Sequence, residues 1–554
     1  MNDPEITSKK RNPRVHEFKQ LLLFIVLPSA LFIALCFLIL PDPSHDNLRA
    51  RIHAAQKTGN NIEAALLLEE LLAAEPENVA LHNEYIHTAH KNARREEAQD
   101  IPDASRIVER YTVLLGDENP VRQDIGFYGL GLLHVLNRDY EKSLWYFKRV
   151  NNTNMKYFNN SIGHAYQCLG RHNEAEYHFR RELDLRGNMQ GALDNLMEML
   201  LHFRRFDDMK RLLDDPGLKE YQQPSLRRIF ALHDRQPGLY LPFLFRQPFQ
   251  RLSVVGLVGA VFGCLIWALF LRRLDVFEPE KPHFLALAFA GGMLAFFFAL
   301  FLYDLVHCLT PLRLNGSWRN DLVYCIAVIG GIEELAKIIP FLLLLRFSSQ
   351  VNETVDYIIY ASMVALGAAF IENIQYFSPD NLRIMEGRTL LSITSHMVET
   401  SIIAWGFVLA RRRGLSPVLV SLLFYVAACV LHGLFDFFLL CDALPVSARG
   451  FTFCTLLVEL LLYREMIIVA LSRSEFYDDS RSERLSTIRR TLGMLLTGVI
   501  LVQFALLSWS FGPRLSLEAL LMRIPLSIFM IYVFSFNIPP GEVRRRNRLL
   551  RGAA

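Results

Sequence analysis

Several common catalytic motifs are missing from this sequence. None of its 8 cysteines forms a Cys-x-x-Cys pair, so neither a zinc knuckle nor a disulfide framework is indicated. The chain has no Gly-x-Ser-x-Gly turn of a serine hydrolase and no His-Glu-x-x-His helix of a zinc protease. Its 59 basic and 56 acidic residues nearly balance, so the chain lacks the strong net positive charge that is typical of nucleic-acid-binding proteins. We therefore expect no nucleic-acid partner, and any catalysis must use another set of residues.

Long apolar stretches are what the chain has instead. Of its 554 residues, 52% are hydrophobic, only 21% are charged, and 40 are phenylalanine. The composition predicts an all-α, polytopic membrane helix bundle of about ten spans, each about 20 residues long as a bilayer core requires, with an inserted α-helical domain. The expected spans are 20–40, 252–271, 284–305, 321–345, 355–376, 390–410, 416–440, 449–471, 491–511 and 519–538.

Lysine and arginine in the short loops predict the orientation of these spans. Basic groups such as Arg272–Arg273, Arg411–Arg413 and Arg544–Arg546 fall on one side if the spans alternate. We expect both termini in the cytoplasm and residues 41–250 outside it, in a bacterial inner membrane. The expected parts are a basic tail (1–19), an anchor (20–40), the helical domain (41–250), a second span and loop (251–283), the catalytic membrane core (284–445), accessory spans (446–538) and a second basic tail (539–554).

The 41–250 segment contains a recurring pattern. Asn61–Asn78 is similar to the second helix of a tetratricopeptide repeat with its closing proline, and its small residue Ala64 recurs at Ala104, Ser143 and Ala175. Gly131–Phe147 overlays Gly163–Phe179 at an offset of 32 residues. Such repeats stack into a superhelix whose concave face binds peptides or proteins. We predict a tetratricopeptide-like array with protein or peptide partners.

Ionisable and polar residues interrupt four consecutive expected spans. A charge at mid-bilayer costs about 3 kcal/mol or more, so such residues need partners, water or a function. The pairs Glu333/Lys337 and His432/Asp436 are each spaced i, i+4 and share a helix face. One of the two adjacent glutamates can thus pair with Lys337 while the other faces a cavity. The residues are Glu333, Glu334 and Lys337, then Glu372 and Asn373, then His396 and Glu399, then His432 and Asp436.

Two chemistries fit this polar set. In one, a carboxylate acts as general base on water while histidine and amide or acid groups stabilise an oxyanion. In the other, histidine and glutamate ligate a divalent metal that lowers the pKa of its bound water. Zn²⁺ is one candidate, and metal-free glutamate chemistry stays equally open.

The ordered motifs Glu333-Glu334-x-x-Lys337, Phe370-x-Glu372-Asn373, His396 and His432-x-x-x-Asp436 resemble the PrsW-type intramembrane proteases, of the CAAX prenyl protease and bacteriocin-processing superfamily. The resemblance spans roughly residues 285–440. It implies an intramembrane endopeptidase, a hydrolase that cleaves membrane-associated proteins and whose best-known role is releasing an anti-sigma factor. It implies catalytic roles for Glu333, Glu334, Glu372, His396 and His432 and supporting roles for Lys337, Asn373 and Asp436. A metal would be held by Glu334, Glu372, His396 and His432.

This chain departs from the minimal family pattern in its helical array and its extra spans. Glu372 and Asp436 also stand where prenyl protease relatives have histidine and asparagine, so we expect no prenyl substrate. The expected partners are a membrane-anchored protein substrate, the lipid bilayer, and proteins or peptides that the array recruits or gates. Two alternatives are a proton-coupled transporter that uses the same glutamates and histidines and a non-catalytic membrane scaffold.

Overall fold

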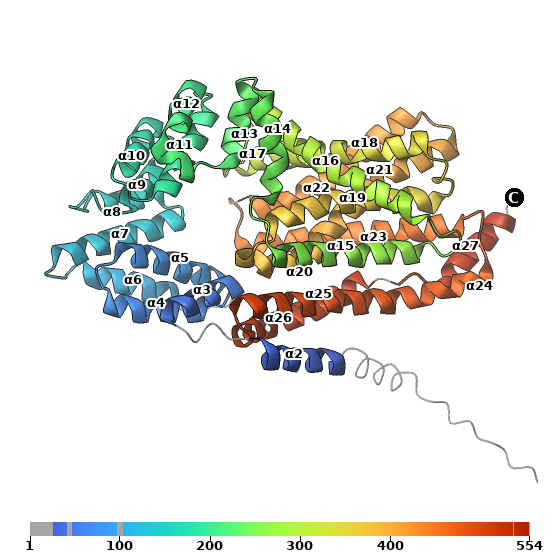
Figure 1. The fold of residues 1–554 in the computed structure, drawn as a ribbon, viewed down its shortest axis with the longest axis horizontal. Helices are drawn as coiled ribbons and strands as arrows, with labels where there is room; N and C mark the ends of the chain where they lie inside the picture. The colour runs from blue at the N-terminus through green and yellow to red at the C-terminus, as the bar shows by residue number, and fades with distance from the viewer. Residues whose placement is uncertain (1–25, 41–46, 97–102, 442, 536, 553–554) are drawn as a thin grey trace, which may run out of the picture.

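The computed structural model describes residues 26–40, 47–96, 103–441, 443–535 and 537–552. Within these ranges the chain is helical and has no strand, which confirms the all-α class. The helical array forms an arc at one end of a bundle of long helices (Figure 1). The predicted basic tail, with Lys9, Lys10, Arg11, Arg14 and Lys19, and residues 20–25 of the first expected span lie outside the described residues.

In the array, helices that follow one another in the chain pack against each other. Gly131 and Gly163 lie against the rings of Phe147 and Phe179, where a Cβ atom would come within 2.5 and 2.8 Å of the ring carbons. The two stretches that overlay in sequence therefore pack in the same way. The helices are α3 (Leu48–Thr58), α4 (Asn61–Ala74), α5 (Val79–Glu96), α6 (Asp103–Leu114), α7 (Pro120–Leu136), α8 (Tyr140–Phe147), α9 (Phe158–Cys168), α10 (His172–Asp184), α11 (Met189–His202), α12 (Phe206–Asp214), α13 (Pro224–His233) and α14 (Pro237–Arg246).

Seven helical segments in the described residues are long and apolar enough to cross a membrane. They contain α15 (Val254–Leu274), α16 (Pro282–Leu309), α19 (Thr354–Tyr376), α21 (Ile393–Arg413), α22 (Pro417–Leu440), α25 (Ile488–Phe511) and α26 (Pro513–Phe534). The segment that ends with α21 begins at Pro379 and includes α20 (Met385–Gly387) and the π-helical turn η7 (Arg388–Ser392), and the one that ends with α25 begins at Asp479 with α24 (Asp479–Ser482).

The other three expected spans are helical but differ from a simple apolar span. The first is described only as α2 (Leu27–Ile39), which contacts α25 and α26. The fourth is divided into α17 (Trp318–Val323), a π-helical segment η5 (Tyr324–Gly330) and α18 (Gly331–Phe347). The eighth is the continuous helix α23 (Gly450–Ser472), which carries Glu459 and other charged residues. The predicted C-terminal tail contains a further helix, α27 (Pro540–Gly552).

Helices α19 and α21 form the centre of the bundle. In each, 83% of the most apolar window is buried inside the protein, compared with 28% for α16 and 33% for α22. A helix so enclosed can carry polar side chains because protein, rather than lipid, surrounds them. The site residues of α19 and α21 are therefore shielded from lipid by the outer helices.

A buried ion pair joins the array to the bundle. Arg228 of α13 makes two contacts with Asp304 of α16, at 2.5 and 2.8 Å, and Tyr240 of α14 donates a hydrogen bond of 2.9 Å to the same carboxylate. Both charged side chains are at most 5% exposed. Neither charge has access to water, so each depends on the other.

We predict that Arg228→Ala destabilises the protein by about 3–5 kcal/mol, because Asp304 is left as a buried charge without its cation. Thermal unfolding of the purified protein in detergent measures the change. The matched control is Arg211→Ala, since Arg211 is 80% exposed in its pair with Asp208 and such pairs contribute about 0–1 kcal/mol. Equal losses in the two variants would contradict the assignment.

Candidate active site

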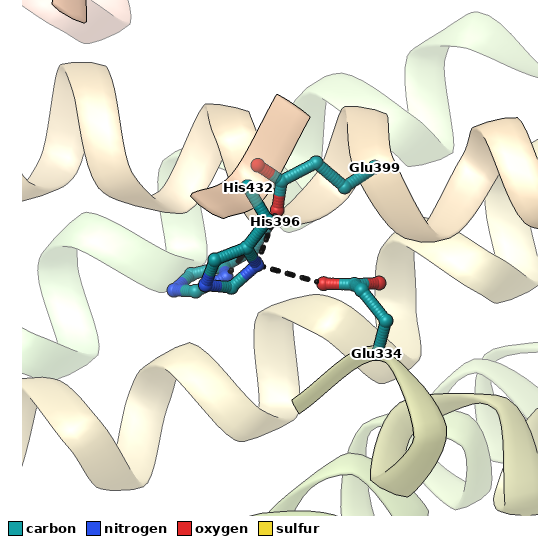
Figure 2. Close-up of side chains that lie close together, drawn as sticks. All are labelled: Glu334, His396, Glu399 and His432. Atoms are coloured by element: carbon teal, nitrogen blue, oxygen red, sulfur yellow. Dashed lines mark hydrogen bonds and ion pairs between the residues drawn. The ribbon is translucent and has the colours of Figure 1, made fainter. Parts of the chain in front are cut away.

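Four helices bring their polar residues to one place inside the bundle. Glu333 and Glu334 lie in the first turn of α18, and Glu372 lies near the end of α19. His396 and Glu399 come from α21, and His432 and Asp436 come from α22. Figure 2 shows Glu334, His396, Glu399 and His432 with their side chains directed toward one another. The structure thus unites the residues that the sequence places on four consecutive segments.

Glycines at two helix crossings make this convergence possible. A Cβ atom on Gly330 would lie 2.7 Å from the backbone oxygen of Cys429, and one on Gly433 would lie 2.4 Å from the Cα of Ile326. These two glycines let the segment before α18 touch the backbone of α22. At the crossing of α16 and α19, Gly292 and Gly367 do the same, each with a hypothetical Cβ 1.9 Å from a backbone oxygen of the other helix.

Two histidines and two glutamates form the most compact part of the site. One ligand atom from each of Glu334, His396, Glu399 and His432 lies within 4.8 Å of the others, and all four residues are buried. His432 Nδ1 is 3.0 Å from Glu334 Oε1 and 2.9 Å from Glu399 Oε2 (Figure 2). We call this set the four-residue cluster.

The adjacent glutamates have different surroundings. Glu334 is fully buried, forms an ion pair with Lys337 and accepts a hydrogen bond of 3.0 Å from Thr400. The Lys337 ammonium also lies 3.1 Å from Nδ1 of His396. Lys337 therefore neutralises Glu334 rather than Glu333.

Glu333 points into a cavity instead. Its side chain is 25% exposed, it accepts a hydrogen bond of 3.0 Å from Tyr303, and its Oε2 lies 3.7 Å from Nε2 of His432. The cavity has a volume of about 1460 Å³, and Glu333, Glu372, His396, His432 and Asp436 line it. Glu333 is thus the acid of the pair with access to water.

Glu372 lies beside the four-residue cluster. The sequence led us to expect Glu372 as the fourth member of the cluster, and Glu399 occupies that position in the structure. Glu372 pairs with Arg388 at 2.8 Å and lies 3.2 Å from Nε2 of His396. Asn373 is fully buried and accepts a hydrogen bond of 2.6 Å from Nε of the same arginine. Arg388 therefore orients both residues.

Asp436 and Glu459 approach the cluster from further out. Asp436 Oδ2 lies 3.4 Å from Nε2 of His432, in agreement with the shared face expected from their spacing. Glu459 is fully buried on α23, and Ser395 Oγ lies 2.7 Å from Glu399 and 2.8 Å from Glu459. A hydroxyl has one proton, so both contacts are hydrogen bonds only if one of the two carboxyls carries a proton.

Sequence reasoning gave four contacting residues no role in the site. Tyr303, Arg388, Ser395 and Thr400 are ordinary in a membrane sequence, and no spacing marks them. Glu399 was identified only as a neighbour of His396 at i+3, a signal that could have placed it in the cluster. Their roles depend on which helices face each other.

A comparison with known protein families covers the segment that carries the site. Residues 280–463, about a third of the chain, match the model of the PrsW family intramembrane metalloproteases. The match contains every residue of the site, indicates a peptidase, and makes this segment a PrsW-type domain within a longer chain.

Outside that domain the comparisons say less. A stretch of 116 residues is 29% identical to anaphase-promoting complex subunit 3 of Schizosaccharomyces pombe, and it covers 19% of this chain and 17% of that protein. The match gives only weak support to a tetratricopeptide-like array. No solved structure was found to match the chain.

We predict that Arg388→Lys destabilises the protein by about 1–3 kcal/mol, because a single ammonium cannot bond both Glu372 and Asn373 as the guanidinium does. Thermal unfolding in detergent measures the loss. Arg411→Lys, an exposed residue at the end of α21, is the matched control and should change stability by less than about 0.5 kcal/mol. If the Arg388→Lys protein is as stable as the control, the two guanidinium contacts to Glu372 and Asn373 do not contribute to stability.

Proposed function

We propose that this chain is an intramembrane endopeptidase that hydrolyses membrane-anchored proteins, with Glu333 as the general base. One observation carries the proposal: Glu333 faces the cavity beside two imidazoles, while its neighbour Glu334 is enclosed and neutralised by Lys337. A carboxylate that reaches water can accept its proton as the oxygen attacks a carbonyl carbon.

The other cavity-lining groups have complementary roles in this proposal. His432 flanks Glu333, and its Nε2 donates a hydrogen bond to the oxyanion that forms on the substrate carbonyl. His396 lies on the other side of Glu333 and is held there by Lys337 at Nδ1 and by Glu372 at Nε2. Tyr303 orients the Glu333 carboxylate through its hydroxyl. Arg388 and Asp436 fix Glu372 and His432 and hold the imidazoles in position. We call these positioning roles, because each acts through a neighbouring group.

The four-residue cluster fits a divalent cation in donor number and donor type. Two imidazoles and two carboxylates are ordinary zinc ligands, and ligands at about 2.1 Å from a tetrahedral ion lie about 3.4 Å apart, so the observed spread of up to 4.8 Å requires a small contraction. When bound, such an ion would lower the pKa of a water molecule. The Lys337 ammonium already contacts Glu334 and His396 of the cluster, so a bound cation would compete with it for these two residues.

The lysine and arginine distribution supports a further part of the proposal, that the array lies outside the cytoplasm of a bacterium. The array also contributes a wall of the cavity that holds Glu333. A protein substrate would therefore meet the array on its way to the site, as recruitment or gating by the array requires.

We predict that Glu333→Gln lowers cleavage of a single-span reporter protein in proteoliposomes by about 100- to 10,000-fold, because the amide cannot accept the proton. Gel analysis of the cleaved reporter measures the rate. Glu70→Gln, an exposed glutamate of the array, is the matched control and should cleave normally. Cleavage that persists in Glu333→Gln, and also in His432→Ala, would refute the proposed site.

We predict that the purified chain binds one Zn²⁺ and that His396→Ala or His432→Ala removes it, because each imidazole is one of the four donors of the cluster. Elemental analysis after dialysis measures the metal. Glu372→Gln should retain it, since Glu372 is paired with Arg388 outside the cluster. Metal-free protein that still cleaves in a Glu333-dependent way would instead establish glutamate chemistry without a metal.

A further inference from the structure

The first end of the array is attached to the membrane bundle. Ala54 of α3 packs in a buried cluster with Leu382, Leu507, Phe511 and Leu515, which belong to the segment before α20 and to α25 and α26. Polar contacts surround this cluster: His53 and Lys57 each lie 3.5 Å from Asp380, and Asn60 donates a hydrogen bond of 3.2 Å to Glu518. Helix α3 is thus seated on the C-terminal helices of the bundle.

The other end is attached at a separate place. Besides the buried Arg228–Asp304 pair, Arg204 donates a hydrogen bond of 3.2 Å to the backbone oxygen of Cys308, at the end of α16. The Cys308 side chain itself packs into the hydrophobic core of the array. Arg313, in the loop that follows α16, donates to the backbone oxygen of Glu198 in α11 at 3.2 Å. The array therefore forms an arch that is fixed to the bundle at both ends (Figure 1).

The cavity that contains the site runs beneath this arch. Its walls include His164 of α9 and His202 of α11 on the array side, and Glu333 and His396 on the membrane side. Arg523 of α26, close to the first attachment, also lines it. The same cavity is thus bounded by the array, by the site and by the helix that supports the array.

The size of the cavity limits what it can hold. All the empty space inside it, including the part that opens to solvent, is about 3910 Å³. A folded domain of about 50 residues has a radius of gyration of about 10 Å, and a compact sphere with that radius of gyration encloses about 9000 Å³. A folded domain is therefore too large for this cavity, whereas an extended segment of chain fits.

We propose that the array restricts this enzyme to membrane proteins whose segment on the array side of the membrane is unfolded. The inference rests on the proposed peptidase function and adds the class of substrate. The arch admits an extended chain to Glu333 and excludes a folded domain because both of its ends are fixed. Removal or unfolding of the substrate's domain is then the event that makes the substrate cleavable.

Three reporters that share one membrane span test this selectivity with the full-length protein in proteoliposomes. The first carries a small three-helix domain on the array side. The second carries the same domain unfolded by aspartate substitutions of its core leucines, and the third carries a glycine-serine tail of equal length. We expect the two unfolded reporters to be cleaved at least tenfold faster than the folded one. Equal rates for all three would overturn the inference.

A loosened arch provides the second arm of the experiment. In the double variant Asp380→Ala, Glu518→Ala the polar contacts of α3 are lost, and cleavage of the folded reporter should rise several-fold while that of the tail reporter stays the same. The control removes Glu70 and Glu109 together, two exposed glutamates with no bond among the described residues. A selectivity that is unchanged in the double variant would overturn the assignment to the arch.

The outcome separates this inference from the proposed function. If no reporter is cleaved in a Glu333-dependent way, the peptidase function fails and the inference falls with it. If the tail reporter is cleaved in a Glu333-dependent way but the folded reporter is cleaved equally fast, only the inference fails.

Discussion

The structure depends on one electrostatic constraint, the compensation of buried charge inside a membrane bundle. Glu334 is fully enclosed, and leaving such a charge unpaired costs several kcal/mol. Lys337, Thr400 and His432 together satisfy it. Because these partners come from α18, α21 and α22, the compensation holds three helices at a fixed mutual position. Glu333 is adjacent to Glu334 in the same helical turn, so fixing Glu334 also fixes the direction in which Glu333 points.

The same constraint explains why the central helices are polar. Helices α19 and α21 carry Glu372, His396 and Glu399, which no lipid-facing helix could hold at low cost. The outer helices α16 and α22 are largely exposed and apolar. Glycines at the helix crossings let them pack closely against the neighbouring segments. An enclosed polar centre that opens only into the cavity concentrates the chemistry where a substrate backbone can reach it.

The array extends this organisation beyond the membrane. Its two attachments use different physics, a buried ion pair at α16 and a small apolar cluster with exposed polar contacts at α25 and α26. The first is costly to break, whereas the second is held by groups that water can also solvate. The array therefore has a firm end beside the site and a weaker end at the far side of the cavity.

The sequence by itself determined the helical class, the order of the apolar segments and the identity of the polar residues, because these follow from composition and from helical spacing. It paired His432 with Asp436 correctly for the same local reason. It did not determine that Lys337 compensates Glu334, that Arg388 holds Glu372, or that Glu399 joins the cluster. Lys337 lies within one helical turn of both Glu333 and Glu334, so local spacing leaves the choice between them open. The other two contacts join different helical segments, and spacing within one helix carries no information about which faces meet. Only the tertiary structure decided them, through the glycine crossings that set how closely the helices approach.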